Sequence, residues 1–202
     1  MSERMVKKFN NRNKLILETA EKLINDHGYH RVKMSDISEE LDIAKGTLYS
    51  HYQSKEQLTF SIVKPKMDNF LTTMEKIESS NLSESKKIVS FIENGFSSDF
   101  FHFVLSSFPD MGAIFSEDYN SELKLIQEKI ITIFERVIKE GTRNKTFQTT
   151  VPSNFLALQL LQIFDPLIYK TLVSSGGVSS KEFVNQSVTF FMAAINNIKG
   201  EY

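Results

Sequence analysis

Apolar residues recur along most of the chain with the three- and four-residue spacing of an α-helix. Ile16, Ala20, Leu23 and Ile24 place a first helix ahead of the sequence DHGY, where Gly28 is a natural C-terminal residue. No run of alternating polar and apolar residues stands out, and no internal repeat is present. The pattern therefore predicts an all-α fold of about nine helices.

Three further helices are predicted in the N-terminal third. Apolar residues between positions 34 and 41 predict a short second helix, and residues 47–52 predict a short third one. The sequence SKEQ has the form of a capping box with Ser54 as the N-cap. It opens a long fourth helix, in which Pro65 is expected to cause a bend.

The rest of the chain also reads as helical. The polar stretch SSNLSES marks a boundary before a helix that begins near Ser83, and residues 119–140 form an amphipathic helix. Residues 153–173 predict one strongly apolar helix containing Pro166. After the turn SSGGVSS, the sequence SSKE caps a last helix over residues 181–199.

Composition places the chain among ordinary globular proteins. Of its 202 residues, 41% are hydrophobic and 24% are charged, which suits one large domain or a small domain joined to a larger one. The chain has no Cys, which excludes disulfides and Cys-ligated zinc. No apolar run approaches the ~20 residues of a membrane span and the N-terminus lacks a signal-peptide core, so we expect a cytoplasmic protein without a membrane partner.

Charge is distributed unevenly, although the formal net charge is only −1. Residues 61–202 lean acidic, whereas residues 1–14 are basic: Arg4, Lys7, Lys8, Arg12 and Lys14 face a single acid, Glu3. We interpret residues 1–10 as a basic N-terminal arm. Its charge favours a polyanionic partner, and a solvated, disordered tail is an equally open interpretation.

Residues 34–53 have the spacing of a helix-turn-helix, with Asp42 at the corner between two short helices. Asp tolerates left-handed backbone geometry, so this corner is feasible. Gly46, in the first turn of the second helix, weakens that helix by roughly 0.5–1 kcal/mol relative to Ala. A protruding helix of this width fits the major groove of B-DNA, and a missing Cβ permits close approach to the duplex.

Polar and aromatic residues around this second helix are the candidate DNA contacts. Lys45 and Thr47 can reach base edges or phosphates, and Lys55 starts the next helix, where the helix dipole favours a phosphate. A structural explanation also exists for single residues, with Tyr52 half in the core and Lys45 merely solvated. The complete candidate set is Ser35, Ala44, Lys45, Gly46, Thr47, Tyr49, Ser50, His51, Tyr52 and Lys55.

The sequence MSDISEELDIAKGTLYSHYQSKEQL, residues 34–58, closely resembles the DNA-binding segment of the tetracycline-repressor (TetR) family of bacterial transcriptional regulators. The preceding ILETAEKLINDHGYHRVKM resembles the first helix of that family, so the specific resemblance covers about residues 11–60. Four positions depart from the family pattern: Lys33 replaces a usual Thr cap, Ser38 a common Ala, Asp42 the turn Gly and Ala44 a frequent Ser cap.

The resemblance implies a three-helix DNA-binding domain over residues 11–60 and a larger helical ligand-binding and dimerisation domain over residues 61–202. It further implies a homodimer on palindromic operator DNA, acting most often as a repressor and released when a small effector binds. Neither a cofactor nor a metal is expected.

The last two predicted helices are apolar on more than one face, which exceeds what an edge helix needs for packing within one chain. Paired across a two-fold axis, they would form a four-helix dimer interface. Burial inside one chain is the alternative. The candidate interface residues are Phe155, Leu158, Gln162, Phe183, Phe190 and Phe191.

Residues 91–115 are rich in Phe and could line an apolar pocket for a hydrophobic or aromatic effector. His102 and Asp165 are the polar groups that would orient such a ligand. Plain core packing is the alternative explanation of an aromatic stripe at helical spacing. The candidate ligand contacts are Phe100, Phe101, His102, Phe115, Phe134, Phe164, Asp165 and Tyr169.

Enzyme motifs are missing from the sequence. It has no Gly-rich phosphate loop, no His-x-x-x-His and no Gly-x-Ser-x-Gly turn, and its four His residues are scattered. We therefore expect a DNA-binding regulator and no catalytic residues. The alternative is a helical adaptor that reuses a helix-turn-helix as a scaffold, although scaffolding requires neither Lys55 nor the basic arm.

Overall fold

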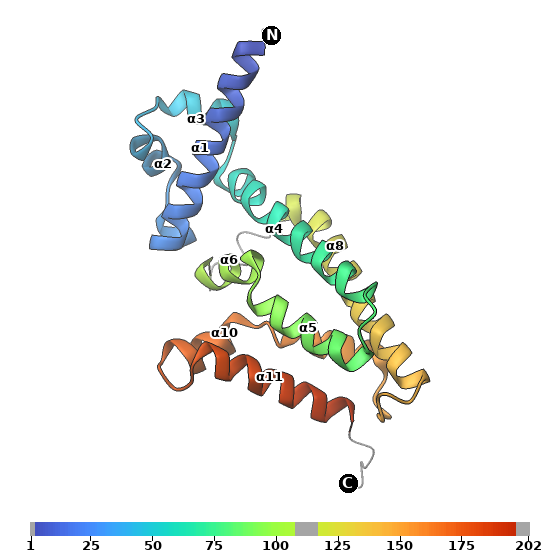
Figure 1. The fold of residues 1–202 in the computed structure, drawn as a ribbon. Coiled ribbons are helices and arrows are strands. Elements are labelled where there is room, and N and C mark those ends of the chain that lie inside the picture. The colour runs from blue at the N-terminus through green and yellow to red at the C-terminus, as the bar shows by residue number, and fades with distance from the viewer. Residues whose placement is uncertain (1–2, 108–116, 197–202) are drawn as a thin grey trace. The chain divides into compact units, whose positions relative to one another are not determined.

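The computed structural model describes residues 3–107 and 117–196. Over these residues the regular structure consists of ten α-helices, a 3-10 turn (Tyr29–Arg31) and a π turn (Lys170–Ser174), and no strand is formed (Figure 1). The all-α class predicted from the periodicity is thereby confirmed.

The chain divides into two compact units. The N-terminal unit comprises Met1–Lys66 and Phe103–Leu123, and the second unit comprises Met67–His102 and Lys124–Tyr202. Two long helices, α4 (Lys55–Glu78) and α8 (Glu117–Arg143), contribute residues to both units. The domain boundary expected near residue 60 therefore lies inside a continuous helix.

Helix α1 (Glu3–His27) opens the N-terminal unit and buries Ile16, Ala20 and Ile24 completely, in agreement with the periodicity. It ends at Gly28, whose φ of 86° lies in the region that favours glycine. Residues 3–10, expected to form an arm, are exposed and make up the first turns of α1. The basic segment is thus a helical extension and not a disordered tail.

Helices α2 (Met34–Glu40) and α3 (Lys45–His51) form the helix-turn-helix. Asp42 adopts a φ of 49°, the left-handed geometry expected at the corner. The Ile43 N–H donates to the Ser38 carbonyl at 3.0 Å and closes the turn. The turn is therefore built as its sequence predicts, with Asp in place of the usual Gly.

Local side-chain bonds cap the starts of α2 and α4. The Lys33 N–H donates to the Asp36 carboxylate at 2.8 Å, and this bond holds the pKa of Asp36 below its ordinary value. At α4, the Gln57 N–H donates to the Ser54 hydroxyl (3.1 Å), and the Gln53 N–H donates to the Gln57 side chain (2.7 Å). The SKEQ sequence caps α4 as predicted.

The second unit adds α5 (Glu84–Phe96), the start of α6 (Asp99–Ser107) and α11 (Ser180–Ile195). Helix α11 packs against α5 and starts at Ser179, whose hydroxyl accepts from the Glu182 N–H at 3.1 Å as predicted. The last turn of α4 is also fixed in this unit.

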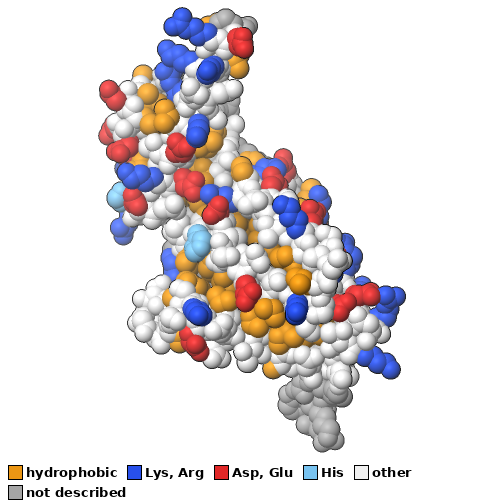
Figure 2. All heavy atoms as spheres, in the orientation of Figure 1, with side chains coloured by type: hydrophobic (Ala, Val, Ile, Leu, Met, Phe, Trp, Pro, Cys, Tyr) orange, Lys and Arg blue, Asp and Glu red, His pale blue; other side chains and the backbone are white. Residues whose placement is uncertain are grey.

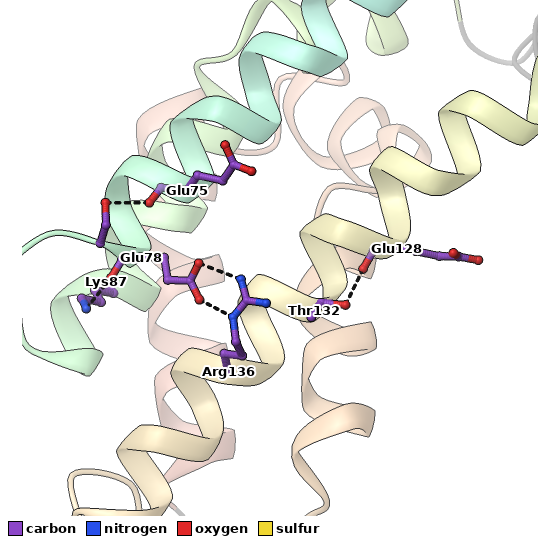
Figure 3. Close-up of polar contacts among 7 residues, drawn as sticks. Glu75, Glu78, Lys87, Glu128, Thr132 and Arg136 are labelled. Atoms are coloured by element: carbon purple, nitrogen blue, oxygen red, sulfur yellow. Dashed lines mark hydrogen bonds and ion pairs between the residues drawn. The ribbon is translucent and has the colours of Figure 1, made fainter.

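Figure 3 shows how Glu78, at the end of α4, is held. Its carboxylate accepts two hydrogen bonds from the Arg136 guanidinium, at 2.6 and 2.8 Å, and its carbonyl accepts one from the Lys87 ammonium at 2.6 Å. Bidentate pairing fixes geometry as well as distance. These bonds connect the end of α4 to α5 and α8.

The prediction of a single helix over residues 153–173 is wrong. The structure has α9 (Ser153–Gln162), α10 (Pro166–Tyr169) and the π turn, with a bend of 46° between α9 and the helical segment that follows. Among the described residues no single helix is long and apolar enough to cross a membrane, and this bent pair meets the length and composition criteria only together.

The break follows from the chemistry of two adjacent residues. Pro166 has no N–H to donate and stands at the first position of α10, where none is needed. The Asp165 carboxylate accepts from the Leu167 N–H at 2.7 Å and caps the new helix.

Pro65 lies inside α4, which extends through it to Glu78.

Candidate functional site

Helix α3 turns one side to the protein and the other to solvent. Leu48 is fully buried, and Thr47 is half-buried. The exposed residues are Ala44 just before the helix, then Lys45, Gly46, Tyr49 and Ser50. Five of the candidate DNA contacts are therefore exposed to solvent, and 49% of the surface of Tyr49 is accessible.

Among residues 3–107 and 117–196, no neighbour packs closely on Gly46. A Cβ built at this position would have no atom within 4 Å beyond its immediate neighbours, and Gly46 lies in α3 with no positive φ. A Cβ at this position would therefore meet open space in the folded protein. The glycine costs local helix stability without an internal benefit, so its benefit must lie outside the chain.

The polar groups beside Gly46 are held by short local bonds. The Thr47 N–H donates to the Ala44 carbonyl at 2.8 Å, and the Ser50 hydroxyl donates to the Thr47 carbonyl at 2.7 Å. On α2, the half-buried Ser35 hydroxyl donates to the Asp36 carboxylate at 3.2 Å. These contacts leave Lys45 and Tyr49 as the longest exposed side chains of the face.

Tyr52 lies in the core of the N-terminal unit. It is only 6% exposed, and burial raises the pKa of its hydroxyl, which also bonds to Asn13 and Ser61. The structure therefore gives Tyr52 a packing role, and its ring is not available to DNA.

Lys55 is also engaged inside the unit. Its ammonium donates to the carbonyls of Tyr29 and Val32 at 2.9 and 3.0 Å and lies 3.9 Å from the centroid of the Tyr29 ring. The Tyr29 hydroxyl donates to the Glu56 carboxylate at 3.3 Å. Lys55 thus joins the start of α4 to the turn after α1. The sequence did not suggest this role, because Tyr29 and Val32 lie 26 and 23 residues before Lys55.

His51 turns toward α1. Its ring stacks on that of Phe9 with centroids 4.0 Å apart and an interplanar angle of 16°, and its Nδ1 lies 3.3 Å from Asn13 Oδ1. Burial, and secondarily the charge of Arg12, lowers the pKa of His51. Sequence reasoning missed both α1 partners, because they lie about forty residues away.

Basic side chains gather over the N-terminal part of α1 (Figure 2). Lys8 and Arg12 line a shallow groove with Leu15 of α1 and with Leu41 and Ile43 of the turn before α3. Further along, Lys14 pairs with Glu18 at 3.6 Å. The positive segment therefore borders the turn of the helix-turn-helix.

Five aromatic rings form one cluster in the second unit. Phe96 contacts Phe101, Phe164, Tyr169 and Phe183, with ring centroids 5.0 to 6.0 Å apart. The Phe164 ring also lies against Gly95, where a Cβ would overlap it. A ligand that entered this cluster would have to displace rings, each of which has an aromatic partner.

The structure brings together part of the candidate ligand set. Phe101, Phe164 and Tyr169 belong to the cluster, and Phe100 joins it through Phe70, which lies 5.9 Å from Phe100 and 6.2 Å from Phe164. The other members are placed elsewhere: Phe134 packs on Phe91 at 5.0 Å, His102 is exposed, Asp165 caps α10, and Phe115 is outside the described residues.

The outer face of α9, α10 and α11 carries a large apolar surface. Phe190 is 72% exposed and shares a groove with Gln162, and Phe155 and Leu158 of α9 are also exposed. Residues of α10 and the π turn that sequence analysis left out extend the same face: Leu167, Ile168 and Leu172. A groove of about 450 Å³ runs between Gln162, Leu172 and Phe190. Exposed apolar surface of this kind is typical of interaction sites.

Two candidate interface residues are buried in their own chain. Phe183 belongs to the aromatic cluster and is 6% exposed, and Phe191 is 2% exposed. Phe191 packs inside the unit, whereas Phe183 both packs in the cluster and lines the floor of the groove beside Phe190. Successive residues on a helix differ by about 100° in direction, which explains why Phe190 and Phe191 have opposite roles.

Across the described residues, no three His, Cys, Asp or Glu side chains come together as a metal site.

Residues 16–62 match the sequence model of a family described as bacterial regulatory proteins, tetR family. The chain is 30% identical over 82 residues to the fatty acid metabolism regulator protein of Bacillus subtilis, a match that covers 41% of this chain and 42% of the relative. It is 35% identical over 63 residues to an HTH-type transcriptional regulator of Staphylococcus aureus, covering 31% of this chain and 34% of the relative. The chain thus spans less than half the length of these curated relatives.

Solved structures resemble the chain over most of its length. A tetR-family regulatory protein from Rhodococcus RHA1 has a TM-score of 0.75 at 16% identity and covers 91% of this chain and 96% of its own. FadR from Bacillus subtilis, in complex with stearoyl-CoA, has a TM-score of 0.70 at 18% identity, covering 90% and 98%. AibR, in complex with isovaleryl coenzyme A and operator DNA, has a TM-score of 0.72 at 22% identity, also covering 90% and 98%. At these identities the likeness shows the fold.

Proposed function

We propose that this chain, whose residues 16–62 match the sequence model of the tetR family of bacterial regulatory proteins, is a transcriptional repressor that binds palindromic operator DNA as a homodimer and is released by a small hydrophobic effector. The observation that carries the proposal is Gly46. A glycine without any packing role, at the exposed start of α3, is explained by close approach of the helix to a duplex.

The proposed DNA-reading face consists of Lys45, Gly46, Thr47, Tyr49 and Ser50, with Ser35 and Ala44 at its border. Lys45 reads base edges in the major groove, and Tyr49 contacts phosphates with its hydroxyl. The basic helical extension of α1 adds phosphate contacts that do not depend on sequence. Tyr52 and Lys55 support the face from inside the unit.

Binding by a repressor is tested directly with the DNA upstream of the gene and with a random-sequence library. The wild-type protein should protect a palindromic site whose half-sites lie about one or more helical turns apart. Lys45→Ala should relax the preference at particular base pairs, a loss of about 1–3 kcal/mol of discrimination. If the wild-type protein selects no sequence from either source, the adaptor alternative is correct.

The proposed dimer forms through the apolar face of α9 to α11. Exposed Phe155, Leu158 and Phe190 support it, because a face of this kind needs a partner. Phe190→Glu would place a charge in the proposed interface, so sedimentation should show a monomer whose circular dichroism spectrum equals that of the wild type. A Phe190→Glu variant that still sediments as a dimer would exclude this interface.

The proposed effector is an acyl-CoA or a related acyl compound. Two structural neighbours bind stearoyl-CoA and isovaleryl coenzyme A, and an acyl chain would enter the apolar aromatic cluster of the second unit by displacing its rings. A coupling of 1–3 kcal/mol, typical of allostery, would change DNA affinity by about 5- to 150-fold. Adding acyl-CoAs of increasing chain length to the operator complex should release the protein at one range of lengths, with free coenzyme A as the control.

A further inference from the structure

His51 is the last residue of α3, and its side chain leaves the exposed face of that helix. Its ring lies parallel to the ring of Phe9, with a centroid separation of 4.0 Å and an angle of 16°. Its Nδ1 lies 3.3 Å from Asn13 Oδ1, which accepts the hydrogen bond when the proton is on Nδ1. Phe9 and Asn13 are four residues apart on α1 and therefore project from the same side of that helix.

The two partners belong to a part of α1 that contributes little to the core. Residues 3–11 are exposed, and the first fully buried residue of α1 is Ile16. Phe9 itself remains 44% exposed, although its ring is stacked on His51. Burial in the core thus explains why α1 is helical from Ile16 onward. Phe9 and Asn13, which precede this segment, instead contact His51 at the end of α3.

The His51 ring itself is poorly suited to attract a phosphate. Burial and the Arg12 charge lower its pKa and favour the neutral imidazole, which lacks the charge that attracts a phosphate oxygen. Asn13 also bonds to Tyr52, the residue after His51, so one α1 side chain holds two successive residues.

We propose that His51 is a positioning residue: through Phe9 and Asn13 it ties the C-terminal end of α3 to the N-terminal extension of α1 and thereby sets the orientation in which α3 reads DNA. The inference rests on the proposed function. It gives the extension a second role besides its charge, and it moves His51 from the DNA-contacting residues to those that orient α3.

The test uses the full-length protein and a duplex that the wild-type protein has selected from a random-sequence library. Affinity is measured by fluorescence anisotropy over a series of salt concentrations for His51→Ala, His51→Phe and Phe9→Ala. Met5→Ala, which removes another exposed apolar residue of the same extension, is the matched control. Thermal unfolding of each variant confirms that it is folded at the assay temperature.

The expected loss of affinity for His51→Ala and for Phe9→Ala is about two- to tenfold, the factor that corresponds to one aromatic pair. His51→Phe, which keeps the stack but not the bond to Asn13, should bind more tightly than His51→Ala and recover most of the wild-type affinity. The double variant Phe9→Ala/His51→Ala should bind no more weakly than His51→Ala, because the His51 substitution already removes the contact with Phe9. The slope of log affinity against log salt should stay that of the wild type throughout.

A direct phosphate contact would give a different result. In that case His51→Phe would lose affinity like His51→Ala, the salt slope would fall by about one, and Phe9→Ala would have no effect. Either that pattern or a Phe9→Ala affinity equal to that of Met5→Ala overturns the inference. If Phe9→Ala does not fold, Phe9→Leu replaces it with the same expectations. Failure of the proposed function is distinct, since the wild-type protein would then select no duplex.

Discussion

Gly46 of α3 and Gly95 of α5 are both helical glycines, but opposite surroundings explain them. A Cβ at Gly95 would overlap the Phe164 ring, whereas a Cβ at Gly46 would meet no atom of the rest of the chain within 4 Å. Gly95 is thus required by packing inside the second unit, and Gly46 is required by nothing inside the protein. A residue type that the folded chain does not need is evidence for a contact outside it.

The same contrast holds for neighbouring aromatic residues of α11. Phe191 is 2% exposed and Phe190 is 72% exposed, so one packs the unit and the other extends into solvent. Each pair separates stability from binding. A substitution at the buried member, Gly95 or Phe191, should lower the stability of the fold, whereas a substitution at the exposed member, Gly46 or Phe190, should weaken binding to a partner.

The largest expected effect is that of Phe191→Ala. Removing a fully buried Phe should lower the free energy of unfolding by about 3–5 kcal/mol, because it removes buried apolar surface and leaves a cavity. Phe190→Ala is the matched control and should change the free energy of unfolding by less than about 1 kcal/mol when the monomer is compared. Urea unfolding followed by circular dichroism measures both. Equal losses for the two variants would remove the distinction between the faces of α11.

The glycine pair is tested by Gly46→Val and Gly95→Val. Gly46→Val should weaken operator binding by roughly 100-fold, about 3 kcal/mol, because a branched side chain holds α3 away from the duplex. Its unfolding midpoint should stay within a few degrees of the wild type, since the folded chain has room for the side chain.

Gly95→Val should show the reverse pattern. Overpacking against Phe164 should lower the free energy of unfolding by about 1–3 kcal/mol. Affinity for the operator should remain that of the wild type at temperatures where the variant is folded. If Gly46→Val binds normally, α3 does not approach DNA at this position.

A smaller effect is expected at Lys55, which the sequence placed on a phosphate and the structure places on two carbonyls. Lys55→Met keeps much of the aliphatic length but leaves the carbonyls of Tyr29 and Val32 without their donor. The free energy of unfolding should fall by about 1–3 kcal/mol. The salt slope of DNA binding should not change; a slope lower by about one would show that Lys55 leaves these carbonyls to bind a phosphate.

The smallest expected effect is the pH dependence due to His51. Its pKa in the folded protein is lowered, chiefly by burial, from an unfolded value of about 6.5. The unfolded chain therefore binds more protons as the pH falls below about 6.5, so the stabilisation from neutral His51 is present above that pH and is lost progressively below it. Unfolding midpoints should be measured from roughly pH 8 to pH 5, the range in which His titrates, and should decline less steeply for His51→Phe than for the wild type.

Much of the fold could be predicted because its determinants are local. Gly28, Asp42, Ser54 and Ser179 each act on backbone groups within a few residues, so their turns and caps can be recognised without the rest of the chain. The break at Pro166 was just as local, and it was missed because the apolar pattern continues across it.

The sequence by itself determined the all-α class, the helix-turn-helix with its left-handed corner, and the candidate DNA-contacting residues around Gly46. Tertiary structure alone decided which side chains turn into the protein. His51 contacts Phe9 and Lys55 contacts Tyr29, and Phe191 is buried whereas Phe190 is exposed. The physical reason is the range of the interactions. Caps and turns are bonds between near neighbours along the chain, whereas burial depends on residues that only folding brings together.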